Sequence, residues 1–160
     1  MSETPEHSPE HIEVVDGALG ELAHLPGALL PILHRIQGTL GWIPPASAPR
    51  IAKVLNLSVA EIQGVISFYH DFRSAPPGRR VVKLCRAEAC QAMGAEALAA
   101  HVKDRLGVDF HQTRADGEVT LEPAYCLGNC ACAPALLLNA QLHGRVNPGR
   151  FDRIWEGSES

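Results

Sequence analysis

Hydrophobic residues recur every three or four positions through the first 72 residues of the chain, which is the spacing of amphipathic helices. The expected helices cover residues 12–25, 29–40, 51–55 and 58–69. Ser58 followed by Glu61 forms the sequence pattern of a capping box and marks where the last of these helices begins. The first part of the chain, residues 11–73, is therefore expected to be a small helical bundle.

The hydrophobic pattern changes after the turn-rich segment 74–78, which is the expected domain boundary. Short apolar or alternating runs then predict strands, and one alanine-rich run predicts a helix. The expected elements are a strand at 80–84, a helix at 89–106, a strand at 118–122, a hairpin of 135–138 with 142–146, and a helix at 148–155. This order is typical of an α+β domain, expected over residues 79–157, and it resembles a thioredoxin-like fold.

Composition narrows the class of protein. A chain of 160 residues with 46% hydrophobic residues suffices for one ordinary domain or two small ones. The net charge of -4 is scattered, so no basic face points to nucleic acid, and no apolar stretch approaches the roughly 20 residues that span a bilayer. Residues 1–10 are polar, are expected to form a disordered tail, and lack the regions of a signal peptide. A cytoplasmic protein without membrane insertion is expected.

Four of the five cysteines form two pairs, Cys85-x4-Cys90 and Cys126-x3-Cys130, and each pair lies where an expected strand ends. Thiolates are soft ligands that suit tetrahedral zinc or an iron–sulfur cluster. Disulfides fit poorly, because disulfide-stabilised secreted domains are cysteine-dense and carry a signal peptide. The four-residue spacer of the first pair gives a wider loop than the usual zinc C-x2-C and suits a two-metal cluster.

Local sequence supports a ligand site without deciding which one. Cys90 is expected to open a helix whose N-terminal dipole favours thiolate, and Gly128 is expected to adopt positive φ and donate N–H groups toward sulfur. A [2Fe–2S] cluster, structural zinc, and buried or redox-active thiols remain open, although thiol–disulfide enzymes usually have a tighter C-x2-C spacing. Cys132 is expected to pack as a small hydrophobe; the alternative is ligand exchange with Cys130.

Three segments, in this order, resemble the small thioredoxin-like [2Fe–2S] subunit of NADH:quinone oxidoreductase and its relatives. They are Gly64-Val-Ile-Ser-Phe-Tyr-His70, Cys85-Arg-Ala-Glu-Ala-Cys90, and Tyr125-Cys-Leu-Gly-Asn-Cys130 with Ala133-Pro134. Within that superfamily, the first cysteine loop and the Cys130-Ala-Cys132-Ala-Pro134 continuation look most like the gamma subunit of soluble NAD-dependent formate dehydrogenase. The resemblance covers about residues 12–155.

The resemblance implies a helical bundle followed by a thioredoxin-like [2Fe–2S] ferredoxin domain, acting as a non-catalytic electron-transfer subunit. The cluster ligands it implies are Cys85, Cys90, Cys126 and Cys130. The implied partners are a flavin- and NAD-binding subunit with FMN, onto which the helical part would dock, and a catalytic subunit with a molybdenum cofactor. The chain itself has no G-x-G-x-x-G and no Walker motif. The equivalent subunit of NADH:quinone oxidoreductase or of a bidirectional NAD-linked hydrogenase is the alternative, and a zinc-stabilised interaction module is the alternative of another class.

Overall fold

The computed structural model describes residues 8–158, and the chain divides into two compact units between Pro76 and Pro77. Each unit has a hydrophobic core of its own. No single helix in the described part is both long and apolar enough to cross a membrane. The helices Ser47–Leu55 and Val59–Phe68 pass such a test only when taken together, across a bend of 116°.

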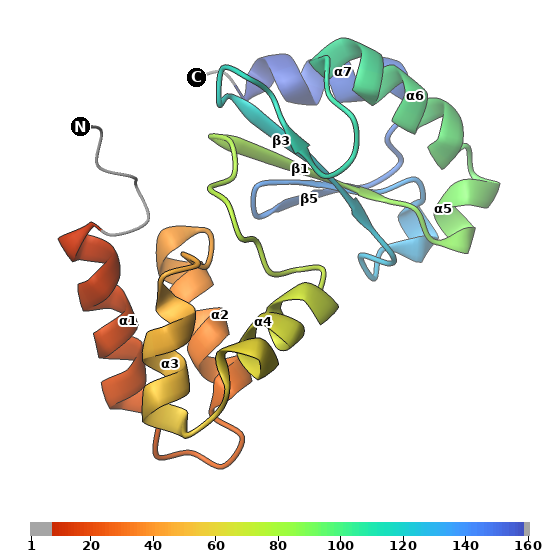
Figure 1. The fold of residues 1–160 in the computed structure, drawn as a ribbon. Coiled ribbons are helices and arrows are strands. Elements are labelled where there is room, and N and C mark those ends of the chain that lie inside the picture. The colour runs from red at the N-terminus through yellow and green to blue at the C-terminus, as the bar shows by residue number, and fades with distance from the viewer. Residues whose placement is uncertain (1–7, 159–160) are drawn as a thin grey trace. The chain divides into compact units, whose positions relative to one another are not determined.

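The first unit contains four helices within its described residues (Figure 1). They are α1 (Pro9–Leu22), α2 (Leu29–Leu40), α3 (Ser47–Leu55) and α4 (Val59–Phe68). Their buried apolar side chains include Val15, Leu19, Ile32, Leu33, Ile36, Ile51 and Ile62. Because these positions recur at the three- and four-residue spacing of the sequence, the helices pack as the expected bundle.

Capping residues set the helix boundaries of this unit. The Ser58 hydroxyl accepts a hydrogen bond from the backbone N–H of Glu61 at 3.1 Å, and the Glu61 carboxylate accepts one from the backbone N–H of Ser58 at 2.7 Å. The predicted capping box is therefore present. Helix α1 begins at Pro9, earlier than expected, because the Ser8 hydroxyl caps it. The remainder of the expected tail, residues 1–7, lies outside the described residues.

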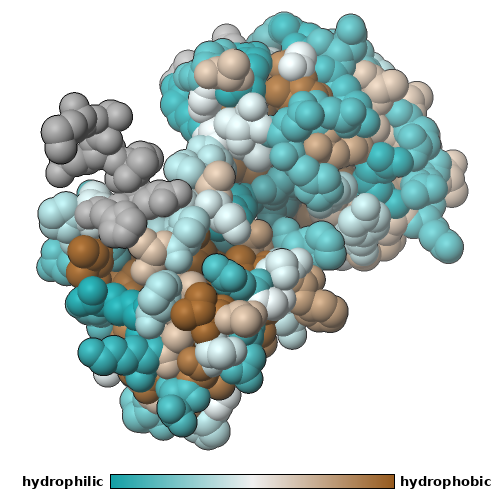
Figure 2. Space-filling view, in the orientation of Figure 1, coloured by the Kyte–Doolittle hydropathy of each residue, from teal (hydrophilic) through white to brown (hydrophobic). Residues whose placement is uncertain are grey.

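The surface of the helical unit is not uniformly polar. Figure 2 shows hydrophobic side chains among the polar ones on its visible face. The large apolar side chains of this unit that remain exposed are Ile12, Leu25, Val54, Val59, Phe68 and Tyr69. Among them, Phe68 and Tyr69 lie side by side, with ring centres 5.2 Å apart.

The second unit is built on a five-stranded sheet, within its described residues, with the order β2-β3-β1-β4-β5. The strands are β1 (Arg80–Cys85), β2 (Gln112–Thr113), β3 (Val119–Ala124), β4 (Leu136–Leu138) and β5 (Gln141–His143). The central strand β1 runs parallel to β3 and antiparallel to β4. This α+β architecture is the predicted fold class.

Two helices, α6 (Ala95–Leu106) and α7 (Pro148–Gly157), cover one face of the sheet, and the short α5 (Glu88–Ala92) follows β1 (Figure 1). The core beneath them contains Val82, Leu84, Leu98, Val102, Leu106, Leu121, Leu136 and Phe151. Burying each large apolar side chain contributes about 1.5–3 kcal/mol. The strand that leads to the first cysteine is therefore firmly held.

The second unit differs from its sequence prediction in three places. The helix expected over 89–106 is divided, because Gly94 adopts φ +93° between α5 and α6. Strand β2, only two residues long, was not expected. The second hairpin strand, expected over 142–146, is shorter because residues after His143 leave the ladder and bond to another loop.

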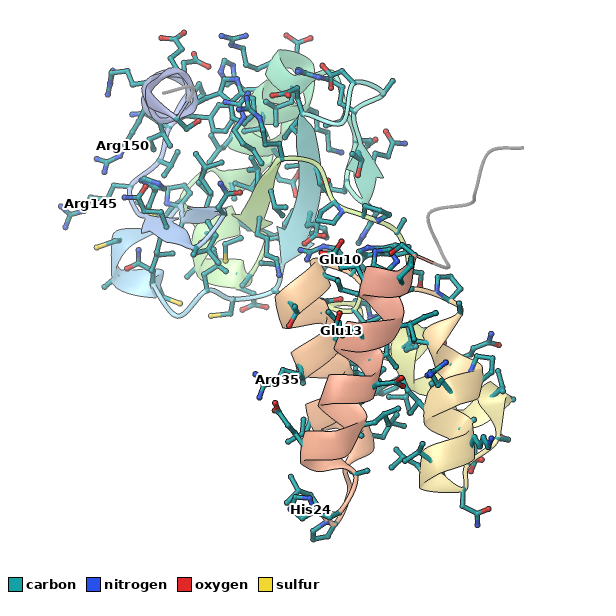
Figure 3. The ribbon with its side chains drawn as sticks, turned by 90° about the vertical axis from the view of Figure 1, so that its left-hand side faces the viewer. Glu10, Glu13, His24, Arg35, Arg145 and Arg150 are labelled. Atoms are coloured by element: carbon teal, nitrogen blue, oxygen red, sulfur yellow. The ribbon has the colours of Figure 1, made fainter. Side chains whose placement is uncertain are left out.

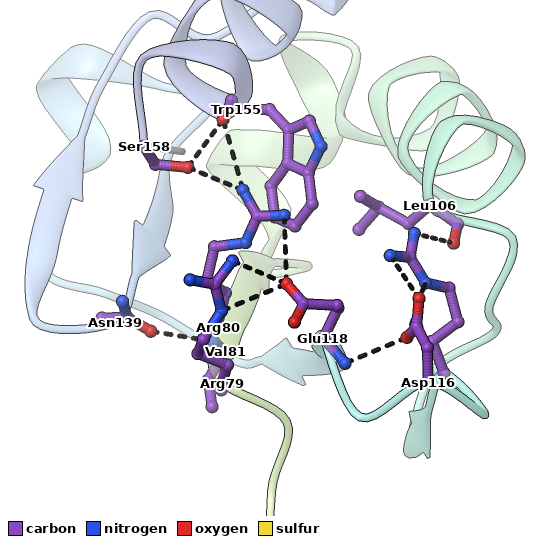
Figure 4. Close-up of polar contacts among 10 residues, drawn as sticks. Arg79, Arg80, Val81, Leu106, Asp116, Glu118, Asn139, Trp155 and Ser158 are labelled. Atoms are coloured by element: carbon purple, nitrogen blue, oxygen red, sulfur yellow. Dashed lines mark hydrogen bonds and ion pairs between the residues drawn. The ribbon is translucent and has the colours of Figure 1, made fainter. Parts of the chain in front are cut away.

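A buried charge joins the first strand of this unit to its last helix (Figure 4). Arg80 is 5% exposed, and its guanidinium lies 3.4 Å from the centre of the Trp155 ring. It also donates hydrogen bonds to the Ser158 hydroxyl at 3.1 Å and the Trp155 carbonyl at 3.5 Å. These contacts compensate for removing the charge from water and tie α7 to the start of β1.

Candidate metal centre

The first cysteine pair is part of the packed interior. Cys85 is the last residue of β1 and Cys90 lies in α5, and the two are 2% and 1% exposed. They pack with Ala95, Ala133 and Ala135, and the backbone N–H of Cys85 donates to the Ala135 carbonyl at 3.0 Å. The fold therefore holds these two thiols in the packed interior of the domain.

Arg86 anchors the loop that joins these two cysteines. Its backbone N–H donates to the Ala124 carbonyl at 2.7 Å, and its carbonyl accepts from the Gln91 side chain at 2.7 Å. Its guanidinium pairs with Glu96 of α6 and lies 5.0 Å from the Phe110 ring centre. The side chain thus holds the loop to the body of the domain.

The second cysteine pair is exposed. Cys126 and Cys130 follow β3, and their Sγ atoms lie 3.8 Å apart. Gly128 between them adopts φ +73°, and its N–H lies 3.4 Å from the Cys126 Sγ as a hydrogen-bond donor. The predicted backbone conformation of Gly128 and its donation to sulfur are confirmed. Cys126 itself has φ +128°, a strained value for a residue with a side chain.

A backbone clasp, formed by residues 144–146, holds the far side of this second loop. The N–H of Arg145 donates to the Cys132 carbonyl at 2.6 Å, and the N–H of Val146 donates to the Pro134 carbonyl at 2.9 Å. Gly144 permits this approach, since a Cβ there would lie 2.7 Å from the Cys132 Cβ. Cys132 itself is partly buried beside the exposed pair.

The two pairs influence each other electrostatically. Burial raises the pKa of the Cys90 thiol, and its hydrogen bond with Cys85 and nearby charge on Cys85 and Cys130 raise it further. The pKa of Cys130 is also raised, first by its hydrogen bond with Cys126 and then by charge on that neighbour. The raised pKa of Cys90 is opposite to the lowering expected at the start of a helix, and α5 is only 5 residues long. Four thiolates gathered here need a cation to compensate their mutual repulsion.

The outer cysteine pair has the spacing of two ligands on one metal ion. Within residues 8–158, no group of three or more His, Cys, Asp or Glu side chains is placed to hold a metal ion. Two thiolates on one tetrahedral ion, with metal–sulfur bonds of about 2.3 Å, lie about 3.8 Å apart. Cys126 and Cys130 have this separation. Two pairs of sulfur ligands, one pair for each iron, are the donor set of a [2Fe–2S] cluster.

The comparison with known families identifies the class of protein. The family described as thioredoxin-like [2Fe-2S] ferredoxin matches residues 15–159, which is most of the chain. The chain therefore belongs to this family. The expected thioredoxin-like fold, [2Fe–2S] cofactor and electron-transfer role are confirmed.

Individual relatives lie in NAD-linked and NADP-linked systems. The chain is 33% identical over 159 residues to a subunit of the NADH-quinone oxidoreductase of Pseudomonas aeruginosa, covering 98% of this chain and 90% of the relative. It is 30% identical over 154 residues to the HndA subunit of the NADP-reducing hydrogenase of Solidesulfovibrio fructosivorans, covering 94% and 90%. A crystal structure of an NAD+-reducing [NiFe]-hydrogenase in the H2-reduced state matches with a TM-score of 0.69 at 25% identity. That match covers 82% of this chain and 22% of the hydrogenase chain.

The cysteine spacing predicted the site residues but not the contacts that hold their loops. Neither the anchoring by Arg86 nor the 144–146 clasp belongs to a recognisable motif. Gly144 was the available signal for the clasp, since a glycine within a predicted strand often marks a close backbone approach.

Proposed function

We propose that Cys85, Cys90, Cys126 and Cys130 hold one [2Fe–2S] cluster, through which the chain passes single electrons inside an NAD-linked oxidoreductase complex. The observation that carries this proposal is the meeting of two thiol pairs, with Cys126 and Cys130 at a tetrahedral ligand spacing, in a member of a [2Fe–2S] family. The cluster supplies one-electron redox chemistry. The chain buries one ligand pair and presents the other at the surface.

The complex we favour is an NAD-dependent formate dehydrogenase. In it, the chain would lie beside a flavin- and NAD-binding subunit that carries FMN, with formate oxidised on a molybdenum-containing catalytic subunit. Support comes from the residues of the first cysteine loop, 85–90, and from the 130–134 continuation, which resemble the gamma subunits of such enzymes. The exposed Phe68 and Tyr69 support docking of the helical unit onto the flavin subunit.

A second candidate is the equivalent subunit of an NADH-quinone oxidoreductase or an NAD(P)-linked hydrogenase. The relatives with these names support it, since they match nearly the whole chain. Purification of the native complex separates the candidates: molybdenum with formate-dependent NAD+ reduction supports the first, whereas nickel with hydrogen-dependent reduction, or quinone reduction, supports the second.

We place the complex in the cytoplasm. The five cysteines are unpaired thiols. A reducing compartment keeps such thiols available for iron.

The cluster is tested by the visible absorption spectrum of anaerobically purified protein, with iron and acid-labile sulfide measured on the same sample. We expect red-brown protein with two irons and two sulfides, and an EPR signal after reduction. Colourless protein with one zinc ion would instead make the chain a structural binding module.

The ligand assignment is tested with single Cys→Ser variants and a matched control in the same loop. We expect Cys130→Ser to lower the iron and sulfide content sharply, whereas Cys132→Ser keeps both. Loss of the cluster in C132S with retention in C130S would show that Cys132 is the ligand.

A further inference from the structure

Two arginines, Arg145 beside the second cysteine loop and Arg150 in α7, differ from most arginines of the chain. Elsewhere guanidinium groups pair with carboxylates, as in Arg35–Glu21, Arg50–Asp16, Arg79–Glu118, Arg86–Glu96, Arg105–Glu156 and Arg114–Asp116. Within residues 8–158, the guanidinium groups of Arg145 and Arg150, like that of Arg153, form no ion pair or hydrogen bond. Figure 3 shows Arg145 and Arg150 pointing outward on the same side of the second unit.

The positive charge of Arg150 affects the neighbouring side chain of His143. His143 is partly buried, and burial lowers its pKa; the nearby positive charge of Arg150 lowers it further. A carboxylate paired with Arg150 would oppose that effect. The two arginines thus form a basic edge on a chain whose net charge is -4.

An apolar groove lies next to this basic edge. It has a volume of about 460 Å³ and is lined by Met93, Leu98, Ala131, Pro134, Arg145 and Val146, among others. Ala131 stands between Cys130 and Cys132, so the groove adjoins the exposed ligand loop. Met93 is 64% exposed, an unusual position for a large apolar side chain.

We propose that this groove and its basic edge receive a carboxylate-bearing segment of the flavin- and NAD-binding subunit. An apolar side chain of that segment fills the groove against Met93, and its carboxylate pairs with Arg145 and Arg150. The inference rests on the proposed function, because the occupant is the electron-transfer partner of that function.

The composition of the groove and its edge is that of a protein interface, which favours a protein segment as the occupant. Protein interfaces combine an apolar centre with a charged rim, and Met and Arg are enriched in them. Arginine binds carboxylates through two parallel hydrogen bonds, and methionine adapts its shape to a partner. Charge complementarity at the rim also speeds and orients encounter. A segment bound here would cover the side of the domain where Cys130 is exposed.

The test measures the dissociation constant between the cluster-loaded full-length chain and the purified flavin- and NAD-binding subunit, at low and high salt. The variants are Arg145→Gln with Arg150→Gln, Arg150→Gln alone, Met93→Gln, and Arg79→Gln as control. Arg79 is a suitable control because it is exposed and precedes the first residue of β1, whereas Cys85 lies at the opposite end of that strand. Arg150→Gln alone guards against misfolding, because Arg145 has φ +51° whereas Arg150 lies in a helix.

We expect the double variant to bind about tenfold more weakly at low salt, with a shallower salt dependence, because rim charges govern association. R150Q and M93Q should each weaken binding about threefold, and R79Q should bind like the wild type.

Three results would overturn the inference. The first is wild-type affinity and salt dependence in the double variant. The second is unchanged affinity with a shifted midpoint potential, which would mean that the arginines act on the cluster. The third is arginine-dependent self-association measured by light scattering, which would make the occupant a second copy. Iron and sulfide are measured on every sample. Arginine-dependent binding by protein that takes up no iron or sulfide would count against the proposed cluster, whereas arginine-independent binding by cluster-loaded protein counts against this docking site alone.

Discussion

The two cysteine loops of the second unit are held by different means. Cys85 and Cys90 are buried, and the loop between them is anchored to the body of the domain through Arg86. Cys126 and Cys130 are exposed, and backbone conformation and the 144–146 clasp hold their loop. The difference indicates that the two pairs have different roles. Packing holds the inner pair in place, whereas the outer pair stays at the surface, where electrons can be exchanged.

The largest expected effect is a difference in stability loss between a substitution in the core next to the first cysteine loop and one within the second loop. Leu84 is fully buried next to Cys85, so Leu84→Ala should lower the free energy of unfolding of the metal-free protein by about 3 kcal/mol. Leu127→Ala, between the outer cysteines, should cost less than about 1 kcal/mol because that side chain is only partly buried. Urea titration followed by circular dichroism measures both. Equal losses would remove the proposed difference between the loops.

Substitution of one cysteine from each pair tests the same difference between the inner and outer pairs. Cys85→Ser places a hydroxyl in the interior and should destabilise the metal-free protein by about 2 kcal/mol. Cys126→Ser exposes its hydroxyl to water and should change stability by less than about 0.5 kcal/mol. Both variants should lose iron and sulfide, so cluster content serves as the shared control. A destabilised C126S would show that the outer loop is packed more tightly than its exposure indicates.

A smaller effect is expected at the backbone of the outer loop. Gly128 has φ +73°, so Gly128→Ala should cost about 1 kcal/mol in the metal-free protein. Gly157, at the end of α7, has open space around it and ordinary φ, which makes Gly157→Ala the matched control. Denaturant midpoints of the two variants provide the measurement. If G128A and G157A unfold alike, the conformation of Gly128 does not limit the loop.

The smallest effect is a pH dependence beside the clasp. Burial, and secondly Arg150, lower the pKa of His143 below its ordinary value of 6.5. The unfolded chain therefore binds this proton more readily, and stability should fall as pH drops from about 7.5 through 6.5, until His143 titrates in the folded state. NMR titration should show a higher His143 pKa in Arg150→Gln, and His143→Gln should weaken the pH dependence of unfolding. An unchanged pKa in R150Q would contradict the role given to Arg150.

Elements with local signals could be predicted from the sequence. Ser58 and Glu61 identified the start of α4, and Gly41 and Gly107 ended α2 and α6 as left-handed caps. The break at Gly94 was missed because alanine-rich helical spacing continues on both sides of it. Strand β2 could not be foreseen, since two residues carry no periodicity and their pairing with β3 is a tertiary contact.

The sequence predicted which cysteines form the site, but not that one pair is buried and the other exposed. Cysteine spacing and strand ends indicated which thiols would meet, because both β1 and β3 run toward the same edge of the sheet. Burial of one pair depends in part on Ala133 and Ala135, which lie far along the chain, after the second cysteine pair. The strained φ of Cys126 depends on how the loop closes in three dimensions, which spacing alone does not encode.

The stack of Trp155 on Arg80 has a consequence for biosynthesis. The two residues are 75 positions apart, so the first strand leaves the ribosome long before the helix that covers its buried charge. At translation rates of roughly 5–20 residues per second, that gap is roughly 4–15 seconds. Cys85 and Cys90 are made during this interval without the completed sheet that brings the second pair to them. Iron and sulfide are therefore expected to enter after the whole chain has been released.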